Sequence, residues 1–548
     1  PAISGKKKWP ARKDAFIPFF FWGQLMATQV NIFSQRSSGV LLPVFSLPGA
    51  CGIGDLGPAA YRFVDFLQRA GQSFWQILPL GPVSAGTGHS PYTSVSALAG
   101  NPLLISPELL MADGLLKAHQ LVCPDFSAFT VDYERVVQHK RHLFALAWAA
   151  FQSPAHAGQL EDFMAANPWV LDYGLFLALK ESQGGAAWYQ WPEELRRRKQ
   201  APLDRARRQL DTAIRRHCFL QYLFFRQWQR LRSHAAEQGV RLIGDMPIYV
   251  ALDSADVWAH QELFELDASG LPTHVAGVPP DYFSKTGQRW GNPLYRWNAA
   301  EKTVQSRLYD WWEQRLRQNF LFADVLRLDH FRGFEAYWAV PAGEQTAVKG
   351  SWRPGPGLPF FLEMAKRLGH LPCIAEDLGV ITPEVEALRD ALGLPGMKIL
   401  LFAFDMNPDN PYLPYNCPAE SVIYTGTHDN ETAVGWYMNP EVPESSRQEA
   451  RRLARAHSDH PGDFHLDLIY LAMSAPSRLA IFPMQDLLGF GNDCRMNRPG
   501  QAEGNWLWRC PAERINEGLA EWLRDLTGLF GRLPTAPKPE KADEHPHT

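Results

Sequence analysis

The fold is indicated by three apolar stretches that each end in a carboxylate: VLRLD at residues 325–329, CIAE at 373–376 and VIYTGTHD at 422–429. Short apolar runs of this kind are typical of buried parallel strands. The intervals between them leave room for a crossover helix and its loops. Because parallel strands in such folds bring their carboxyl ends together, we expect Asp329, Glu376 and Asp429 to meet at one mouth.

The same alternation of strand and helix patterns continues toward the N-terminus. Residues 39–44 and 74–80 are apolar and flank a helical pattern at 59–67, which predicts a βαβ unit. Another apolar run, at 240–247, contains an acid near its end. We therefore expect an α/β protein built on a (β/α)8 TIM barrel. A doubly wound sheet is the alternative, but the sequence lacks the glycine-rich dinucleotide turn that would favour it.

Composition divides the chain into three parts. Residues 1–34 are expected to be an N-terminal extension outside the core, and 35–530 to form the barrel. Within the barrel, residues 106–237 are charged and nearly free of glycine and proline over long stretches, which predicts an inserted, largely helical subdomain. The arginines of this insertion are more typical of a solvated helix face than of an anion site. Residues 531–548 are rich in Pro, Lys and Glu and are expected to be a disordered tail.

Charge and cysteine content exclude several classes of protein. A net charge of -4 over 548 residues does not favour a nucleic-acid partner. The apolar run near the N-terminus is too short to cross a membrane, so we expect no membrane partner. Seven scattered cysteines without CxxC or Cys/His metal spacing indicate a reducing compartment rather than a disulfide framework. We expect no metal and a cytoplasmic protein, with a plastid as the alternative if the basic N-terminus is a targeting segment.

Three convergent carboxylates suit chemistry on a glycosidic bond. Asp329 is the predicted nucleophile, and Arg327 on the same strand face is expected to hold it ionised and lower its pKa. Glu376 is the predicted general acid, kept protonated by burial or by the charge of Asp429. Each group also has a structural interpretation. Asp329 could form an ion pair with an arginine, and residues 427–430 could be a polar turn or helix cap.

Two loops combine aromatic and hydrogen-bonding side chains at high density. Residues 277–293 have the composition of a loop that closes over a polar, ring-shaped ligand and excludes water. A structural Ω-loop is the alternative. In the second loop, 90–102, Tyr92 could be a stacking platform or a core residue. The 19 Trp and 16 Tyr of the chain can serve both the core and the faces of sugar rings.

Several longer motifs occur together along the chain. They are SPY at 90–92, AGNP at 99–102, GDMPIY at 244–249, the segment 280–293, RLDHFRG at 327–333, AEDLG at 375–379, LPGM at 394–397 and THDN at 427–430. With these motifs the chain resembles the amylomaltases, the 4-alpha-glucanotransferases of glycoside hydrolase family 77. The resemblance extends from about residue 37 to about residue 508.

The resemblance implies roles for individual residues. Asp329 would be the nucleophile, Glu376 the acid/base and Asp429 the carboxylate that stabilises the transition state. The implied substrate-binding residues are Tyr92, Asp281, Ser284, Gln288, Trp290, Arg327, His330, His428 and Asn497. The family fold is a (β/α)8 barrel with inserted subdomains and no separate C-terminal β-domain.

The resemblance also implies a reaction, which is retaining transfer of a segment of an α-1,4-glucan to the 4-hydroxyl of another glucan. It would pass through a covalent glycosyl-enzyme, without a metal or organic cofactor, in starch or glycogen metabolism. Maltooligosaccharides and α-1,4-glucans would be donor and acceptor, and the enzyme would be a monomer. An α-glucan hydrolase with the same three carboxylates and a non-catalytic glucan-binding barrel are the alternatives.

Overall fold

The computed structural model describes residues 33–280, 284–456, 458, 460–501 and 503–534. Its centre is a closed barrel of parallel strands in the order β1-β12-β11-β10-β9-β6-β3-β2. The strands are β1 (Ser37–Leu41), β2 (Phe74–Gln76), β3 (Arg241–Pro247), β6 (Val325–Asp329), β9 (Cys373–Ala375), β10 (Gly396–Ile399), β11 (Ser421–Tyr424) and β12 (Leu479–Pro483). The predicted TIM barrel is therefore confirmed, and the three stretches that end in carboxylates supply β6, β9 and β11.

The strand registers align the carboxyl ends of β3, β6 and β9 with one another. Between β3 and β6, Asp245 pairs with Arg327 and Pro247 with Asp329. Between β6 and β9, Leu328 pairs with Ala375, the residue before Glu376. At β1 the close approach to β2 requires a glycine, since a Cβ on Gly39 would lie 2.5 Å from the Phe74 carbonyl oxygen. Tight packing of neighbouring strands thus fixes which side chains meet at the mouth.

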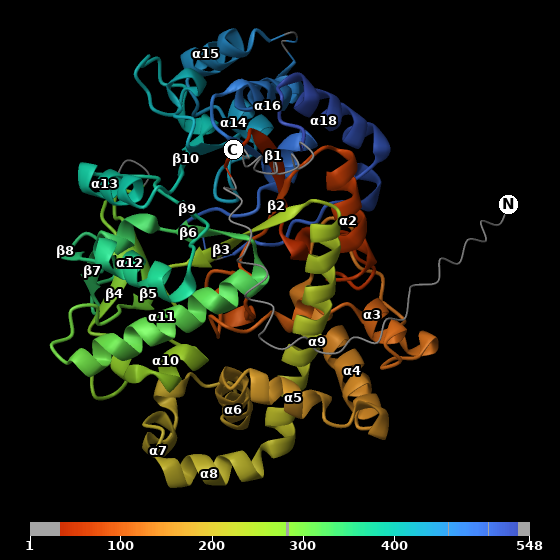
Figure 1. Cartoon of the computed structure of the whole chain (residues 1–548), viewed down its shortest axis with the longest axis vertical. Coiled ribbons are helices and arrows are strands. Elements are labelled where there is room, and N and C mark those ends of the chain that lie inside the picture. The colour runs from red at the N-terminus through yellow and green to blue at the C-terminus, as the bar shows by residue number, and fades with distance from the viewer. Residues whose placement is uncertain (1–32, 281–283, 457, 459, 502, 535–548) are drawn as a thin grey trace, which may run out of the picture.

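Helices surround the barrel, and a helical group extends from it between β2 and β3. In Figure 1 this group lies below the barrel, with the long helix α9 connecting the two. Its helices are α3 (Pro107–Ala112), α4 (Tyr133–Phe151), α5 (Gln159–Ala166), α6 (Trp169–Ser182), α7 (Glu193–Arg196), α8 (Gln200–Gln209) and α9 (Asp211–Glu237). The other helices are α2 (Pro58–Arg69), α10 (Ala255–Ala259), α11 (Lys302–Phe322), α12 (Gly357–Leu368), α13 (Pro383–Ala391), α14 (Ala433–Met438), α15 (Glu444–Ala454), α16 (Phe464–Ser474), α17 (Met484–Leu487) and α18 (Glu517–Leu529). No helix in the described part of the chain is both long and apolar enough to cross a bilayer.

A second, four-stranded antiparallel sheet lies beside the barrel in the order β5-β4-β7-β8. Its strands are β4 (His274–Val278), β5 (Gln288–Pro293), β7 (Ala336–Pro341) and β8 (Ser351–Pro354). The insertion at 106–237 is helical as expected, but the segment 277–293 is only partly a loop, because both of its ends belong to strands. These strands are short, partly exposed and interrupted by glycine and proline, so they lack a clear strand pattern.

A disulfide joins Cys51, in the loop between β1 and α2, to Cys123, in the segment before α4. The cysteine pattern favoured a reducing compartment over a disulfide framework, and this one pair is nevertheless bonded. The two residues are 72 positions apart, so their Cα separation of 5.2 Å could not be seen in the sequence. The remaining cysteines, Cys218, Cys373, Cys417, Cys494 and Cys510, are free thiols.

The start of the expected C-terminal tail packs against the barrel. Arg532 is fully buried, and its guanidinium donates to the carbonyl oxygens of Met473 at 3.0 Å and Ser37 at 2.9 Å. It also donates to the Ala475 carbonyl at 3.0 Å. One side chain therefore connects the segment before β12 to the first residue of β1, and Arg36 donates to two of the same carbonyls, those of Met473 and Ala475. Residues 535–548, like 1–32, lie outside the described residues.

We predict that Arg532→Ala lowers the free energy of unfolding by about 2–5 kcal/mol, because it removes several buried hydrogen bonds and the packing of the Arg532 side chain. The urea midpoint of the full chain, followed by intrinsic fluorescence, checks this. Arg69→Ala is the matched control, since the Arg69 side chain is 48% exposed in its ion pair with Glu517 and such pairs contribute little. Equal midpoints for both variants would contradict the assigned role.

Candidate active site

The three candidate carboxylates gather at the carboxyl ends of the barrel strands. Asp329 is the last residue of β6, Glu376 directly follows β9, and Asp429 lies in the turn after β11. The Glu376 backbone N–H donates to the Leu328 carbonyl at 3.1 Å, which sets the ends of the neighbouring strands β6 and β9 side by side. The charge of Asp429 acts on Asp329, and the charge of Asp329 acts on Glu376. The predicted convergence is therefore present in the structure.

Arg327 is the central cation of the cluster. Its Nη1 lies 2.9 Å from Asp329 Oδ1 and 2.8 Å from both carboxylate oxygens of Asp245. The Arg327 and Asp245 side chains are almost completely buried, at 4% and 0% exposure. Burial disfavours the charged guanidinium, but the two carboxylates outweigh it and raise the pKa of Arg327 well above its usual value. The cation is thus permanent and is shared by two acids.

Asp329 and Glu376 differ in how readily they lose a proton. Burial raises the pKa of Asp329 to about 6, with Arg327 opposing and Asp245 and Asp429 adding to the rise. Burial raises the pKa of Glu376 further, to about 8. Arg327 lowers the pKa of Asp329 as expected, but burial outweighs the cation, so the net pKa lies above its usual value. The order of the two acids nevertheless leaves Asp329 ionised while Glu376 keeps its proton.

Glu376 is held in place by backbone groups. Its Oε2 accepts from the His330 N–H at 2.7 Å and its Oε1 from the Leu378 N–H at 3.0 Å. Both bonds favour the ionised carboxylate and so oppose the effect of burial. A carboxyl group with both oxygens held by backbone N–H groups has a fixed orientation, yet its pKa stays in a range where it can give and take a proton near neutrality.

Asp429 is ionised at any working pH. Burial would raise its pKa, but His428 and Asn497 outweigh it and hold the pKa below the usual range. Asn497 Nδ2 donates to Asp429 Oδ1 at 2.6 Å, and His428 Nε2 lies 3.3 Å from Oδ2. Arg495 also fixes the backbone by donating to the Asp429 carbonyl at 2.6 Å. With 41% of its side chain exposed, Asp429 presents a permanent negative charge to whatever enters the mouth.

Tyr92 joins the two sides of the mouth. Its hydroxyl donates to Asp245 Oδ2 at 2.7 Å and lies 2.8 Å from His428 Nε2. Its ring stacks on the His428 ring with centroids 5.2 Å apart, and Trp506 packs against both rings. Tyr92 and His428 thus connect Asp245 of β3 to Asp429 after β11.

In the part of the chain that the structure describes, the acids of the mouth do not form a group of ligand atoms close enough to share a metal ion. Within the described ranges, three thiolate, imidazole or carboxylate ligand atoms come close enough to share an ion at Cys51, Cys123 and His139. The four acids of the mouth are instead arranged around the Arg327 guanidinium. Their geometry suits proton transfer and nucleophilic attack at a sugar carbon.

Comparison with known proteins agrees with this geometry. The 4-alpha-glucanotransferase model of glycoside hydrolase family 77 matches residues 42–514. The chain belongs to this family. It is 47% identical to the 4-alpha-glucanotransferase of Synechocystis sp. over 506 residues, covering 91% of this chain and 98% of the relative. With the Thermus thermophilus enzyme it shares 47% identity over 510 residues, covering 91% and 99% of the two chains.

A solved structure extends the likeness to three dimensions. The amylomaltase from Streptococcus agalactiae, determined in complex with acarbose, superposes with a TM-score of 0.87 at 38% identity. The match covers 91% of this chain and all of that one. The chain is thus an enzyme of the 4-alpha-glucanotransferase class, with the amylomaltase fold.

In this glucanotransferase, His330 connects the cluster to the antiparallel sheet. It follows β6 with a φ of 52°, a left-handed conformation that non-glycine residues seldom adopt. Trp290 of β5 meets the His330 ring edge-on, with centroids 4.8 Å apart. Burial lowers the pKa of His330 to about 4, helped by Arg332, so the imidazole is neutral near pH 7. A neutral ring can donate to or accept from a sugar hydroxyl.

The family resemblance also implied Gln288, Ser284 and Asp281 of the β4–β5 hairpin as substrate-binding residues. Gln288 and Ser284 each form a hydrogen bond within the hairpin itself. Gln288 accepts a hydrogen bond from Trp290 Nε1 at 3.2 Å and so supports the indole. Ser284 donates to the Gly287 carbonyl at 2.7 Å, within its own turn. Asp281 lies outside the described residues. In this hairpin, ring and hydrogen-bond contacts link Trp290 and Gln288 to His330 of the cluster, while the roles of Ser284 and Asp281 stay predictions.

Two residues of the glucanotransferase site had no role assigned from the sequence. Asp245 lies near the end of the apolar run 240–247, much as the three candidate acids end theirs. This pattern could have marked Asp245 as a site residue. Its function depends on the β3–β6 register, which places it beside Arg327. Trp506 lies in a segment without helix or strand pattern, so the sequence carried no sign that its ring would pack on Tyr92 and His428.

We predict a bell-shaped pH profile of kcat/KM for this enzyme. Below about 6 Asp329 takes up a proton and cannot attack, and above about 8 Glu376 loses the proton it must donate. Asp245→Asn removes a charge that raises the pKa of Asp329, so the acid limb should move to lower pH. Initial rates on a maltooligosaccharide donor from pH 4.5 to 9.5 check this. An acid limb that stays in place or moves upward would contradict the arrangement.

Proposed function

We propose that this enzyme transfers a segment of an α-1,4-glucan to the 4-hydroxyl of a second glucan with retention of configuration, through a covalent glycosyl-enzyme on Asp329. The observation that carries the proposal is the ordering of two partly buried acids at the ends of the neighbouring strands β6 and β9. Asp329 is the group that ionises first, and Glu376 is the group that keeps its proton. A retaining mechanism needs such a pair.

In the first half-reaction, the Asp329 carboxylate forms a bond to the anomeric carbon as the glycosidic C–O bond breaks. The electron pair of that bond goes to the departing oxygen, which receives the Glu376 proton. Arg327 stays bound to Asp245 and keeps the guanidinium beside the reacting carboxylate. The products of this step are the shortened glucan and an ester between the enzyme and the transferred segment.

Formation of the ester changes the proton affinity of Glu376. The negative charge of Asp329 is one of the causes that raise the pKa of Glu376, and Arg327 is the main cause that lowers it. When Asp329 becomes a neutral ester, the first effect disappears and the second remains. The pKa of Glu376 then falls, so the residue that served as acid becomes a base. It takes the proton of the acceptor 4-hydroxyl, whose oxygen displaces Asp329.

Asp429 stabilises the positive charge that develops on the sugar ring in both half-reactions. It is ionised throughout, since His428 and Asn497 hold its pKa low. Its carboxylate is oriented by these same neighbours and remains partly exposed at the mouth. Fixed charge of this kind costs no reorganisation at the moment of reaction.

Transfer requires that a sugar hydroxyl reach the ester before water does. Trp290 is 37% exposed and extends from β5 over His330, which places an apolar indole at the edge of the site. An aromatic surface binds the C–H face of an acceptor sugar and displaces water from the same place. This arrangement supports transfer over hydrolysis.

Maltotriose as sole substrate separates the two reactions. We expect glucose together with a ladder of maltodextrins longer than maltotriose, because a second sugar accepts the segment. Trp290→Ala should raise the ratio of hydrolysis to transfer several-fold, since it removes the acceptor surface. Chromatography of the products checks both points. Maltose and glucose without longer products would show that the enzyme is a hydrolase.

The roles of the two acids are tested with Glu376→Gln and α-maltosyl fluoride. Fluoride leaves without a proton, so Asp329 should still form the ester, whereas the missing base should slow its transfer by about 100-fold or more. Intact-protein mass spectrometry should therefore show one maltosyl group per chain. The double variant Asp329→Asn/Glu376→Gln is the control and should stay unmodified. Modification of the double variant, or none in the single variant, would exclude Asp329 as the nucleophile.

A further inference from the structure

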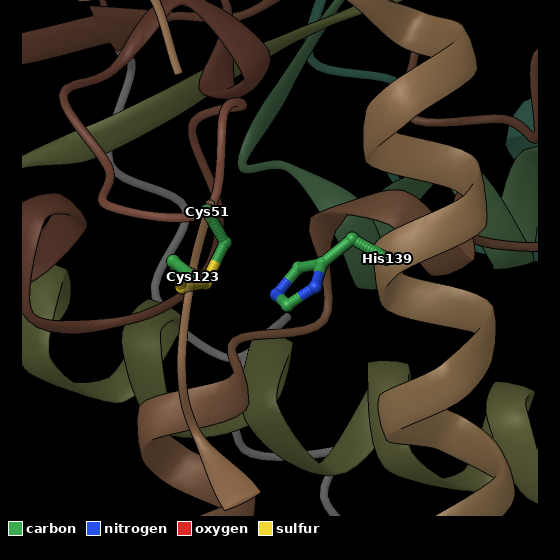
Figure 2. Close-up of side chains that lie close together, drawn as sticks. All are labelled: Cys51, Cys123 and His139. Atoms are coloured by element: carbon green, nitrogen blue, oxygen red, sulfur yellow. A yellow bond between two sulfur atoms is a disulfide. The ribbon is translucent and has the colours of Figure 1, made fainter. Parts of the chain in front are cut away.

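A second group of reactive side chains lies at the junction between the barrel and the helical insertion. Cys51 comes from the β1–α2 loop, Cys123 from the segment before α4, and His139 from α4 itself. One ligand atom of each residue lies within 4.8 Å of the others. Figure 2 shows the two sulfur atoms facing the edge of the His139 ring. The mechanism proposed above uses none of the three.

The His139 imidazole has an unused nitrogen at this junction. Its Nε2 is shielded from solvent and has no hydrogen-bond partner among the described residues. Figure 2 shows a ring nitrogen directed at the sulfur pair. A buried polar atom without a partner costs free energy, so it calls for an explanation. Two sulfur atoms and an imidazole nitrogen are the ligands that Zn²⁺ and other soft cations prefer.

The scaffold around the group is held by other contacts than the disulfide. Lys140, next to His139, forms a buried ion pair with Asp55 at 3.3 Å and donates to the Leu103 and Ile105 carbonyls at 2.7 and 2.8 Å. Gly52 has a φ of +81°, and a Cβ there would lie 2.5 Å from the Phe126 ring. The loop and α4 are therefore packed together beside the cysteines, which keeps the three ligands near one another after reduction.

We propose that the reduced chain binds one Zn²⁺ ion through Cys51, Cys123 and His139, and that oxidation to the disulfide excludes the ion. A dithiol reductant supplies two electrons and two protons to the disulfide and itself becomes a disulfide. The ion then binds both thiolates and the imidazole nitrogen, and the two thiol protons are released to solvent. Tetrahedral zinc with Zn–S bonds of about 2.3 Å sets the sulfur atoms about 3.8 Å apart, and water can take the fourth position.

The site would connect the helical insertion to the barrel in either state. As a disulfide, the bridge is covalent between Cys51 and Cys123. With zinc bound, the same two residues are joined through the ion, and His139 adds α4 to the connection. Such a site could not be recognised from the sequence, because its three ligands come from separate segments and lack a metal-binding spacing.

Cobalt is the probe for this site, because Co²⁺ takes the place of zinc and gives a thiolate charge-transfer band in the near ultraviolet. The full chain is reduced, freed of reductant without air and titrated with Co²⁺, and then with Zn²⁺ in competition. We expect one equivalent of Co²⁺ with the band in the reduced chain, its displacement by Zn²⁺, and neither in the oxidised chain. Elemental analysis checks the stoichiometry.

Variants separate a metal site from a simple dithiol. Cys123→Ser should remove most of the charge-transfer band, and His139→Gln should weaken binding by at least about tenfold. His142→Gln is the matched control, since His142 is an exposed histidine on the same helix and should leave binding unchanged. Circular dichroism and glucanotransferase activity confirm that each variant is folded. A reduced chain that binds no Co²⁺, or one that binds equally well with His139→Gln, would overturn the proposal and leave a dithiol–disulfide pair only.

Discussion

The active site depends on one buried guanidinium that is shared by two carboxylates. Arg327 contacts Asp245 and Asp329 at the same time. The contact with Asp245 follows from the β3–β6 register, and the contact with Asp329 from the two-residue period of β6 itself. Without the cation, two buried acids would repel each other and take up protons. Without Asp245, Arg327 would be free to turn toward Asp329 alone. The shared arrangement fixes the position of the nucleophile while leaving its carboxylate available to react.

The barrel supplies the frame, and hydrogen bonds around its mouth supply the differences among the acids. Glu376 accepts two backbone N–H groups in a buried position, and its pKa is raised. Asp429 accepts from Asn497 and lies beside His428, and its pKa is lowered. Three carboxyl groups of similar intrinsic acidity, those of Asp329, Glu376 and Asp429, thus acquire different pKa values through their surroundings. Tyr92 connects these surroundings across the mouth, from Asp245 to His428.

Much of the barrel and of the site could be predicted from the sequence, for identifiable reasons. Strands β6, β9 and β11 are buried and read as apolar runs, so their terminal acids could be placed at one mouth. The strands of the antiparallel sheet are short, partly exposed and contain glycine and proline, so they lack the alternation of apolar and polar residues that would predict a strand. The role of Asp245 depends on strand register, and the pKa of Asp329 depends on the extent of burial. The pairing of Cys51 with Cys123 depends on a contact across 72 residues. Strand register, burial and this pairing all depend on residues that are far apart in the sequence, so a local pattern cannot predict them.

The mouth holds more carboxyl groups than guanidinium groups, and this affects which glucans it can bind. With Glu376 protonated, three aspartates, Asp245, Asp329 and Asp429, lie near two guanidinium groups, those of Arg327 and Arg495, so we expect a negative electrostatic potential at the mouth. Such a field is indifferent to a neutral glucose ring and attracts one that becomes cation-like as its bond breaks. It also repels anionic groups. A glucan that carries a phosphate near the bond to be cleaved would therefore be excluded by the same charges that make the neutral one react.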